Sequence, residues 1–209
     1  MQEYYFLFDR NKKTEVLFAQ NRAVFDWLQK LSDDYCCLIE FSWAGKGGQS
    51  DFMIIGKNKI VNIEVKGFKG YLKGTLNDNW ALDGKNTNEK NPYKQALDTA
   101  NSFKEYLQQK IFETNKWDNI KVWPIVALPN AAKDSDIPRR GQGNFGDIVS
   151  DETELIDAIE KVKSLSIEIN EGIIRRIARE LNLKIYSVQE LKTIINECVR
   201  IPIQPDHRI

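Results

Sequence analysis

The feature that most constrains this chain is a pair of apolar runs, residues 49–55 and 60–66, separated by a short polar segment. Two such runs around a short turn predict a β-hairpin. A turn centred on Lys57 and Asn58 fixes the register of this hairpin. It pairs Ile55 with Ile60, Ile54 with Val61, Met53 with Asn62, Phe52 with Ile63 and Asp51 with Glu64.

Acidic and basic side chains gather on one face of this predicted hairpin. Because side chains alternate along a strand, Gln49, Asp51, Glu64 and Lys66 share a face. Two carboxylates directly across a ladder are about 5 Å apart, which costs about 3 kcal/mol at an effective dielectric near 20. A divalent metal with oxygen ligands, with Lys66 beside it, would offset this repulsion. A plain Glu64–Lys66 ion pair is the simpler interpretation, but it leaves Asp51 unexplained.

The order Gln-x-Asp followed by Glu-x-Lys resembles the PD-(D/E)xK nuclease superfamily. In more detail, residues 12–130 are similar to the nuclease-related domain (NERD) family, with a weaker continuation to about residue 160. The resemblance is carried by Gln49, Asp51, Glu64-Val65-Lys66, Gly70, Trp80 and the segment Asn91-Pro92-Tyr93-Lys94-Gln95.

This resemblance implies a fold, a cofactor and a set of site residues. The fold is an α/β restriction-endonuclease-like core, in which helices flank a central mixed β-sheet. Asp51, Glu64 and the main-chain carbonyl of Val65 are expected to hold Mg²⁺ or Mn²⁺. Lys66 and Gln95 complete the expected catalytic set, and Gln49 is an accessory residue.

The chain departs from the family pattern on its first helix. The family usually carries a glutamate there, about seven residues before a leucine. Counting back from Leu28, that position is Asn21 in this chain, with Glu15 nearby. An asparagine can hold a metal-bound water but is a weaker electrostatic ligand, so Asn21 is kept as an accessory candidate.

Charge patterning suggests where a nucleic acid would bind. The chain carries no net charge, which argues against a basic surface over the whole protein. Residues 44–75, however, contain six lysines against two acids, and those acids are the proposed metal ligands. The candidate contacts to nucleic-acid phosphates are Lys46, Lys69, Lys73, Arg139 and Arg140.

Other chemistries find little support in the sequence. The single histidine is His207, near the end of the chain, so Ser-His or Cys-His catalysis lacks its base. Cys36, Cys37 and Cys198 have neither zinc-site nor disulfide-framework spacing. No apolar run approaches the roughly 18 residues of a membrane span, and the first residues do not resemble a secretion signal. We therefore expect a cytoplasmic protein without membrane association.

The remaining pattern predicts alternating helices and strands. We expect a helix at 14–31, a strand at 35–43, a short hairpin within 67–82, a helix starting at Asn91-Pro92, a strand at 121–128, a polar loop at 131–148 and helices at 151–162, 171–183 and 188–199. This divides the chain into a NERD-like domain at 1–165 and a C-terminal helical extension and tail at 166–209. The apolar stripes of the last helices suggest a homodimer.

Together these observations predict a metal-dependent nuclease that hydrolyses phosphodiester bonds, with DNA as the expected substrate. The alternative is a catalytically weak or inactive nucleic-acid-binding or partner-docking module of the same fold. The absent first-helix glutamate and the neutral net charge support that alternative.

Overall fold

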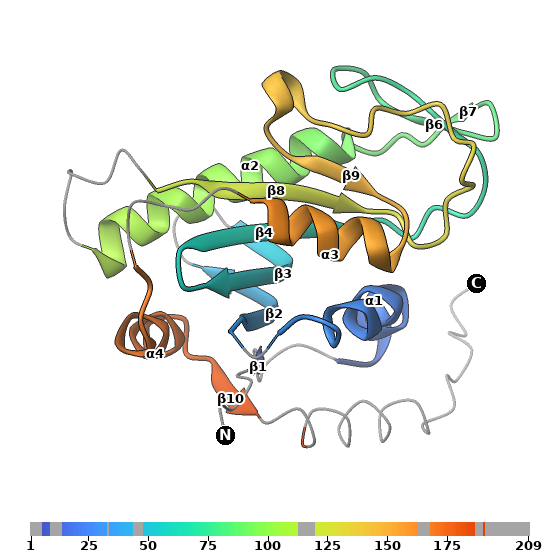
Figure 1. The fold of residues 1–209 in the computed structure, drawn as a ribbon. Helices are drawn as coiled ribbons and strands as arrows, with labels where there is room; N and C mark the ends of the chain where they lie inside the picture. The colour runs from blue at the N-terminus through green and yellow to red at the C-terminus, as the bar shows by residue number, and fades with distance from the viewer. Residues whose placement is uncertain are drawn as a thin grey trace, which may run out of the picture.

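A seven-stranded mixed β-sheet lies at the centre of the structure, a computed structural model (Figure 1). The structure describes residues 6–8, 14–32, 34–43, 48–112, 120–162, 168–186 and 190. In spatial order the strands are β10 (Lys184–Tyr186), β1 (Phe6–Phe8), β2 (Cys36–Trp43), β3 (Gly48–Gly56), β4 (Lys59–Val65), β8 (Val122–Ala127) and β9 (Asp147–Val149). The pairs β1–β2, β4–β8 and β8–β9 are parallel, whereas β10–β1, β2–β3 and β3–β4 are antiparallel.

The central hairpin has the predicted register from Ile55–Ile60 to Phe52–Ile63, whereas the predicted pair Asp51–Glu64 lies just beyond the end of the ladder. Strands β3 and β4 pair Phe52 with Ile63, Met53 with Asn62, Ile54 with Val61, Ile55 with Ile60 and Gly56 with Lys59. Both strands lie in the interior of the sheet, and most of their side chains are buried. Strand β4 is therefore held by β3 and β8 as far as Ile63, and β8 alone pairs with Glu64 and Val65 at its carboxyl end.

Helices cover both faces of the sheet, which confirms the predicted fold class. On one face, α1 (Thr14–Leu28) and α3 (Glu152–Lys161) bury apolar side chains against alternate residues of the strands. On the other face lie α2 (Pro92–Tyr106), its π-helical continuation (Leu107–Ile111) and α4 (Glu171–Glu180). No helix among the described residues is long and apolar enough to cross a bilayer.

Helix α2 begins where the sequence predicts. The Asn91 side chain accepts a hydrogen bond from the Lys94 N–H, and Pro92 takes the first helical position, where its missing N–H costs nothing. The Asn91 amide also donates to the carbonyls of Thr75 and Asp78 at 2.9 and 2.5 Å. Asn91 thus ties the start of α2 to the segment that precedes it.

That segment contains a small second sheet, made of β5 (Leu72–Lys73), β6 (Ala81–Leu82) and β7 (Lys85–Asn86). It lies beyond the carboxyl end of β8, beside the start of α2 (Figure 1). Trp80 is fully buried beneath it and leaves no room for a side chain at Gly74. The predicted short hairpin is therefore present, with β7 as an additional strand.

Several boundaries differ from the sequence-based expectation. The helix expected at 14–31 ends at Leu28, and the helix expected at 171–183 ends at Glu180. Within the expected loop at 131–148, residues 142–144 form a 3₁₀ turn and Asp147 begins β9. Apart from residue 190, the helix expected at 188–199 lies outside the described residues, as does the tail.

Candidate active site

The candidate site lies where β3 and β4 separate. The last pair of their ladder is Phe52–Ile63. Asp51 on β3 and Glu64 on β4 each lie one residue beyond this pair. Because the Lys66 N–H bonds to β8, the Val65 N–H points to the opposite side, toward β3. There it donates to the Asp51 Oδ2 atom at 2.8 Å. The Asp51 carboxylate thus accepts from the first amide beyond the Phe52–Ile63 pair that points toward β3.

The same geometry orients the main-chain carbonyl of Val65. The Lys66 N–H donates to the Ala127 carbonyl at 3.0 Å, and no cis peptide bond occurs in the described chain. In a trans peptide the C=O and the following N–H point in opposite directions. The Val65 carbonyl therefore points away from β8, to the side on which Asp51 lies.

Glu64 is a buried carboxylate beside a lysine. Its side chain is 7% exposed, and its Oε1 atom lies 3.2 Å from the Lys66 Nζ atom. Burial, followed by the negative charge of Asp51, raises the pKa of Glu64 from 4.5 to about 7, although Lys66 acts in the opposite direction. Ionised Glu64 is thus costly without a further cation nearby.

This donor set suits a hard divalent ion. Two carboxylates and one main-chain carbonyl are all oxygen donors, which Mg²⁺ and Mn²⁺ prefer. No group of three or more His, Cys, Asp or Glu side chains that could hold a metal occurs among the described residues. The described chain therefore offers a site with few protein ligands, and Mg²⁺ commonly binds in this way because it retains several waters.

Glu89 is a neighbour that the sequence did not reveal. Its Oε2 atom lies 3.7 Å from the Lys66 Nζ atom, and its side chain is half exposed. Its charge also contributes to the raised pKa of Glu64. Lys66 is thus held between two carboxylates, one buried and one facing solvent. Only the fold brings Glu89, in the loop before α2, to Lys66.

Asn21, the residue in place of the first-helix glutamate, contacts a second acid that the sequence did not reveal. It is 5% exposed and donates from its Nδ2 atom to the Glu40 Oε1 atom at 3.1 Å. Glu40 is 1% exposed and has a φ of +45°, which is rare for a residue other than glycine. It lies on β2 opposite Asp51, between the pairs Ile39–Phe52 and Phe41–Ser50.

The two glutamines occupy different surroundings. Gln95 lies in the first turn of α2 and is partly buried. The Asn62 amide of β4 donates to the carbonyl of the next residue, Ala96, at 3.1 Å, so this turn lies over the Glu64 side of the sheet. No hydrogen bond between the described residues joins the Gln95 side chain to Glu64 or Lys66. Gln49 is exposed and pairs with Ser42.

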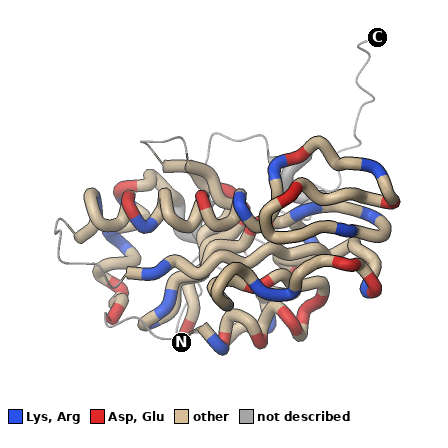
Figure 2. The backbone as a smooth tube through the Cα atoms, turned by 90° about the horizontal axis from the view of Figure 1, so that it is seen from above, with Lys and Arg blue, Asp and Glu red and all other residues tan. Residues whose placement is uncertain are grey.

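The candidate phosphate contacts are not gathered in one place. Lys69 and Lys73 are exposed on the segment after β4, three and seven residues beyond Lys66, whereas Lys46 lies outside the described residues. Arg139 is engaged by Glu154 at 3.7 Å, and Arg140 lies 4.0 Å from Asp147. Basic and acidic residues are interspersed along the chain (Figure 2), in keeping with the zero net charge.

Thiol chemistry is not supported by the two described cysteines. Cys36 and Cys37 are buried and form no disulfide. Burial raises the pKa of the Cys36 thiol to about 12, and the pKa of Cys37 is also raised. Neither thiol is therefore available as a thiolate nucleophile at neutral pH.

The fold and the site define a class of protein: an α/β protein with a mixed sheet flanked by helices, and an acidic pair followed by a lysine at the end of a central strand. The family model of the nuclease-related domain (NERD) matches residues 17–129, more than half of the 209 residues, and the chain belongs to this family. Its function is therefore nuclease-related. Comparisons with curated proteins and with solved structures gave no match.

Proposed function

We propose that the protein is a metal-dependent nuclease that hydrolyses phosphodiester bonds, with DNA as its substrate. The observation that carries this proposal is the grouping of Asp51, Glu64, Lys66 and the Val65 carbonyl where β3 and β4 separate. Two neighbouring carboxylates, one of them buried, are unfavourable without a cation. Membership of the nuclease-related family supports the same chemistry.

Asp51, Glu64 and the Val65 carbonyl would hold Mg²⁺ or Mn²⁺. When bound, such an ion polarises a phosphate and stabilises the negative charge that develops on it during hydrolysis. Asp51 reaches this position because its carboxylate is anchored to the Val65 N–H at 2.8 Å. Glu64 is held by burial and by the neighbouring lysine.

Lys66 is the group proposed to serve the attacking water. Its side chain is 16% exposed, so the ammonium group is shielded yet reachable from solvent. It would orient the water and help to remove its proton as the bond to phosphorus forms. Gln95, and with it Gln49, would position the water or the phosphate through side-chain amides. Lys69 and Lys73 would contact neighbouring phosphates of the DNA.

A second candidate function is a nucleic-acid-binding or partner-docking module that no longer cleaves. The observation in its favour is that the first helix presents an amide, Asn21, which is already engaged by Glu40. The contact between Glu89 and Lys66 also favours this second function, because the Glu89 carboxylate engages the lysine that would otherwise serve the attacking water.

The decisive test compares Asp51→Asn with a matched control, Asp98→Asn. Asp98 is an exposed acid on α2 that pairs with Lys90 at 2.6 Å, and an exposed pair contributes little to stability. Cleavage of supercoiled, linear and single-stranded DNA, and of RNA, is measured with Mg²⁺, Mn²⁺ or EDTA. Thermal stability is measured on the same samples with and without millimolar metal.

We expect metal-dependent cleavage and metal-induced stabilisation in the wild type and in Asp98→Asn, and neither in Asp51→Asn. Asp51→Asn should stay folded, since it removes one of two repelling charges. Binding of nucleic acid without cleavage under any metal would favour the second function. An identical thermal response of wild type and Asp51→Asn to metal would show that the metal site is wrong.

A further inference from the structure

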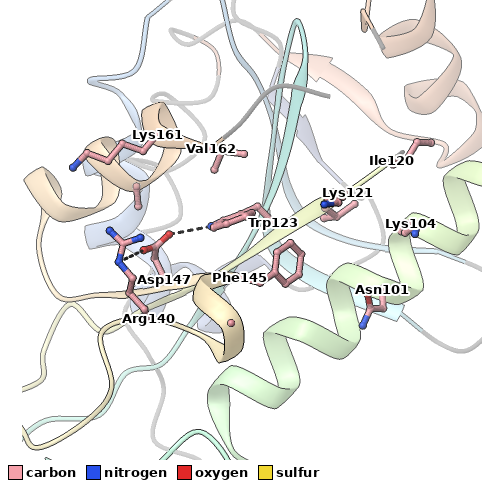
Figure 3. Close-up of a pocket in the computed structure, with 13 residues that line it drawn as sticks. Asn101, Lys104, Ile120, Lys121, Trp123, Arg140, Phe145, Asp147, Lys161 and Val162 are labelled. Atoms are coloured by element: carbon pink, nitrogen blue, oxygen red, sulfur yellow. Dashed lines mark hydrogen bonds and ion pairs between the residues drawn. The ribbon is translucent and has the colours of Figure 1, made fainter. Parts of the chain in front are cut away.

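Figure 3 shows a pocket of about 990 Å³ that no candidate active-site residue lines. It opens beside the first residues of β8, between α2, α3 and the turn that precedes β9. At this end of β8, Val122 pairs with Ile60, whereas the candidate site lies at the other end, near the pair Ala127–Val65. Val122 and Ala127 are five residues, or roughly 17 Å, apart along the strand, and none of Asp51, Glu64, Val65 and Lys66 lines the pocket.

The pocket is positively charged. Lys104, Lys121, Arg140 and Lys161 line it, against the single acid Asp147. The Asp147 carboxylate is already engaged, since its Oδ2 atom accepts from the Trp123 Nε1 atom at 3.0 Å and its Oδ1 atom lies 4.0 Å from the Arg140 Nε atom.

Two of these cations are uncommitted. Lys161 forms an ion pair with Asp157 at 3.0 Å, and Arg140 is paired with Asp147. No hydrogen bond or ion pair engages the side chains of Lys104 and Lys121 within the described chain. Lys104 comes from α2 and Lys121 from the start of β8, so two separate elements contribute lysines to the wall of the pocket.

Aromatic rings form another part of the wall. Trp123 and Phe145 are both partly exposed, with ring centroids 4.8 Å apart and an interplanar angle of 71°. The hydrogen bond to Asp147 fixes the indole of Trp123. The turn that carries Phe145 is held because the Tyr93 hydroxyl donates to the Phe145 carbonyl at 2.7 Å. The rings are therefore positioned before any ligand arrives.

We propose that this pocket binds a nucleotide unit, with the phosphate at Lys104 and Lys121 and the base against Trp123. Lysines beside a partly exposed aromatic ring match both halves of a nucleotide, because a base stacks on an aromatic face and a phosphate attracts ammonium groups. The source of the unit is either a free nucleotide or a strand of nucleic acid. This pocket lies outside the proposed nuclease centre, and the nucleotide unit would bind to it without a metal ion.

The test measures binding in EDTA, where no metal-dependent cleavage takes place. A fluorescein-labelled thymidine oligonucleotide is titrated with wild type, with Lys104→Ala/Lys121→Ala and with the control Lys30→Ala/Lys85→Ala. The control removes two exposed lysines that do not line the pocket. Tryptophan fluorescence is followed in parallel with Trp123→Phe, and melting temperatures establish that all variants are folded.

We expect the pocket variant to bind the oligonucleotide at least about tenfold more weakly and to lose about one to two units of the log–log salt slope. The control should match the wild type, and Trp123→Phe should lose most of the fluorescence change. Competition by dAMP would identify free nucleotide as a ligand, whereas binding of the oligonucleotide alone would identify a strand.

Equal affinity of the pocket variant and the control for the oligonucleotide, together with an unchanged fluorescence response in Trp123→Phe, would overturn the proposal. Because the measurement excludes metal, that outcome would leave the proposed nuclease function untouched. Loss of cleavage in Asp51→Asn, in turn, carries no information about this pocket.

Discussion

Glu64 is expected to make the metal-free protein less stable at neutral pH than at mildly acidic pH. Its pKa is about 7 in the folded protein, against 4.5 for an ordinary glutamate, mainly because the carboxylate is buried and faces Asp51. Below about pH 4.5 the group is protonated in both folded and unfolded states, so it costs nothing. Between 4.5 and about 7 only the unfolded state releases the proton, and stability falls as pH rises.

The size of this effect follows from the shift. Each pKa unit corresponds to about 1.4 kcal/mol, so a rise from 4.5 to about 7 costs about 3 kcal/mol once Glu64 is ionised in both states. The Glu64 side chain is 7% exposed, so solvent screens this cost little. Above about pH 7 the full cost is present, and a bound divalent cation would offset it.

The assay is chemical denaturation at pH 4.5 and pH 8 in EDTA, for wild type and Glu64→Gln. Glutamine is neutral at both values, so we expect the loss of stability between them to be about 3 kcal/mol smaller in the variant. Glu180→Gln, which changes an exposed glutamate on α4, is the control and should follow the wild type. Millimolar Mg²⁺ should stabilise the wild type more at pH 8 than at pH 4.5. Parallel pH profiles for wild type and Glu64→Gln would refute the argument from burial.

Three further outcomes are expected. Lys66→Ala should lower single-turnover cleavage at least about a hundredfold, or about 2.7 kcal/mol, while stabilisation by metal persists; normal activity per folded molecule would leave Lys66 with only a structural role. Asn91→Ala should lower the free energy of unfolding by about 2 kcal/mol or more, because it removes bonds to Lys94, Thr75 and Asp78; an unchanged urea midpoint would contradict this. Light scattering should detect a homodimer, and a monomer at high micromolar concentration, with and without DNA, would exclude it.

The parts of the fold that sequence could predict are those determined by local rules. The β3–β4 register follows from side-chain alternation and the turn at Lys57-Asn58, so Phe52 meets Ile63 as expected. The start of α2 follows from the capping preference of Asn91 and the fixed φ of Pro92. Both depend on residues close together in the chain, and both were predicted in the correct place.

The parts that sequence did not predict depend on distant partners. Glu40 sits within an apolar run and gains its place beside Asn21 only when α1 packs on β2. Glu89 meets Lys66 only because the small sheet folds back toward β4. The three-residue strands β9 and β10 are too short to carry a periodic signal, and each is defined by a partner far away in the chain.

The pairing of β10 with β1 has a practical consequence for work on oligomeric state. Strand β10, late in the chain, covers one side of β1, and β2 covers the other. A fragment that stops before α4 would leave the hydrogen-bonding groups of β1 open on that side, and it would uncover the apolar surface on which Ile177 and Ala178 pack. Open strand edges join other copies readily. Dimers formed by such a shortened protein would therefore reflect an exposed edge, and the stoichiometry of the native protein has to be measured with β10 in place.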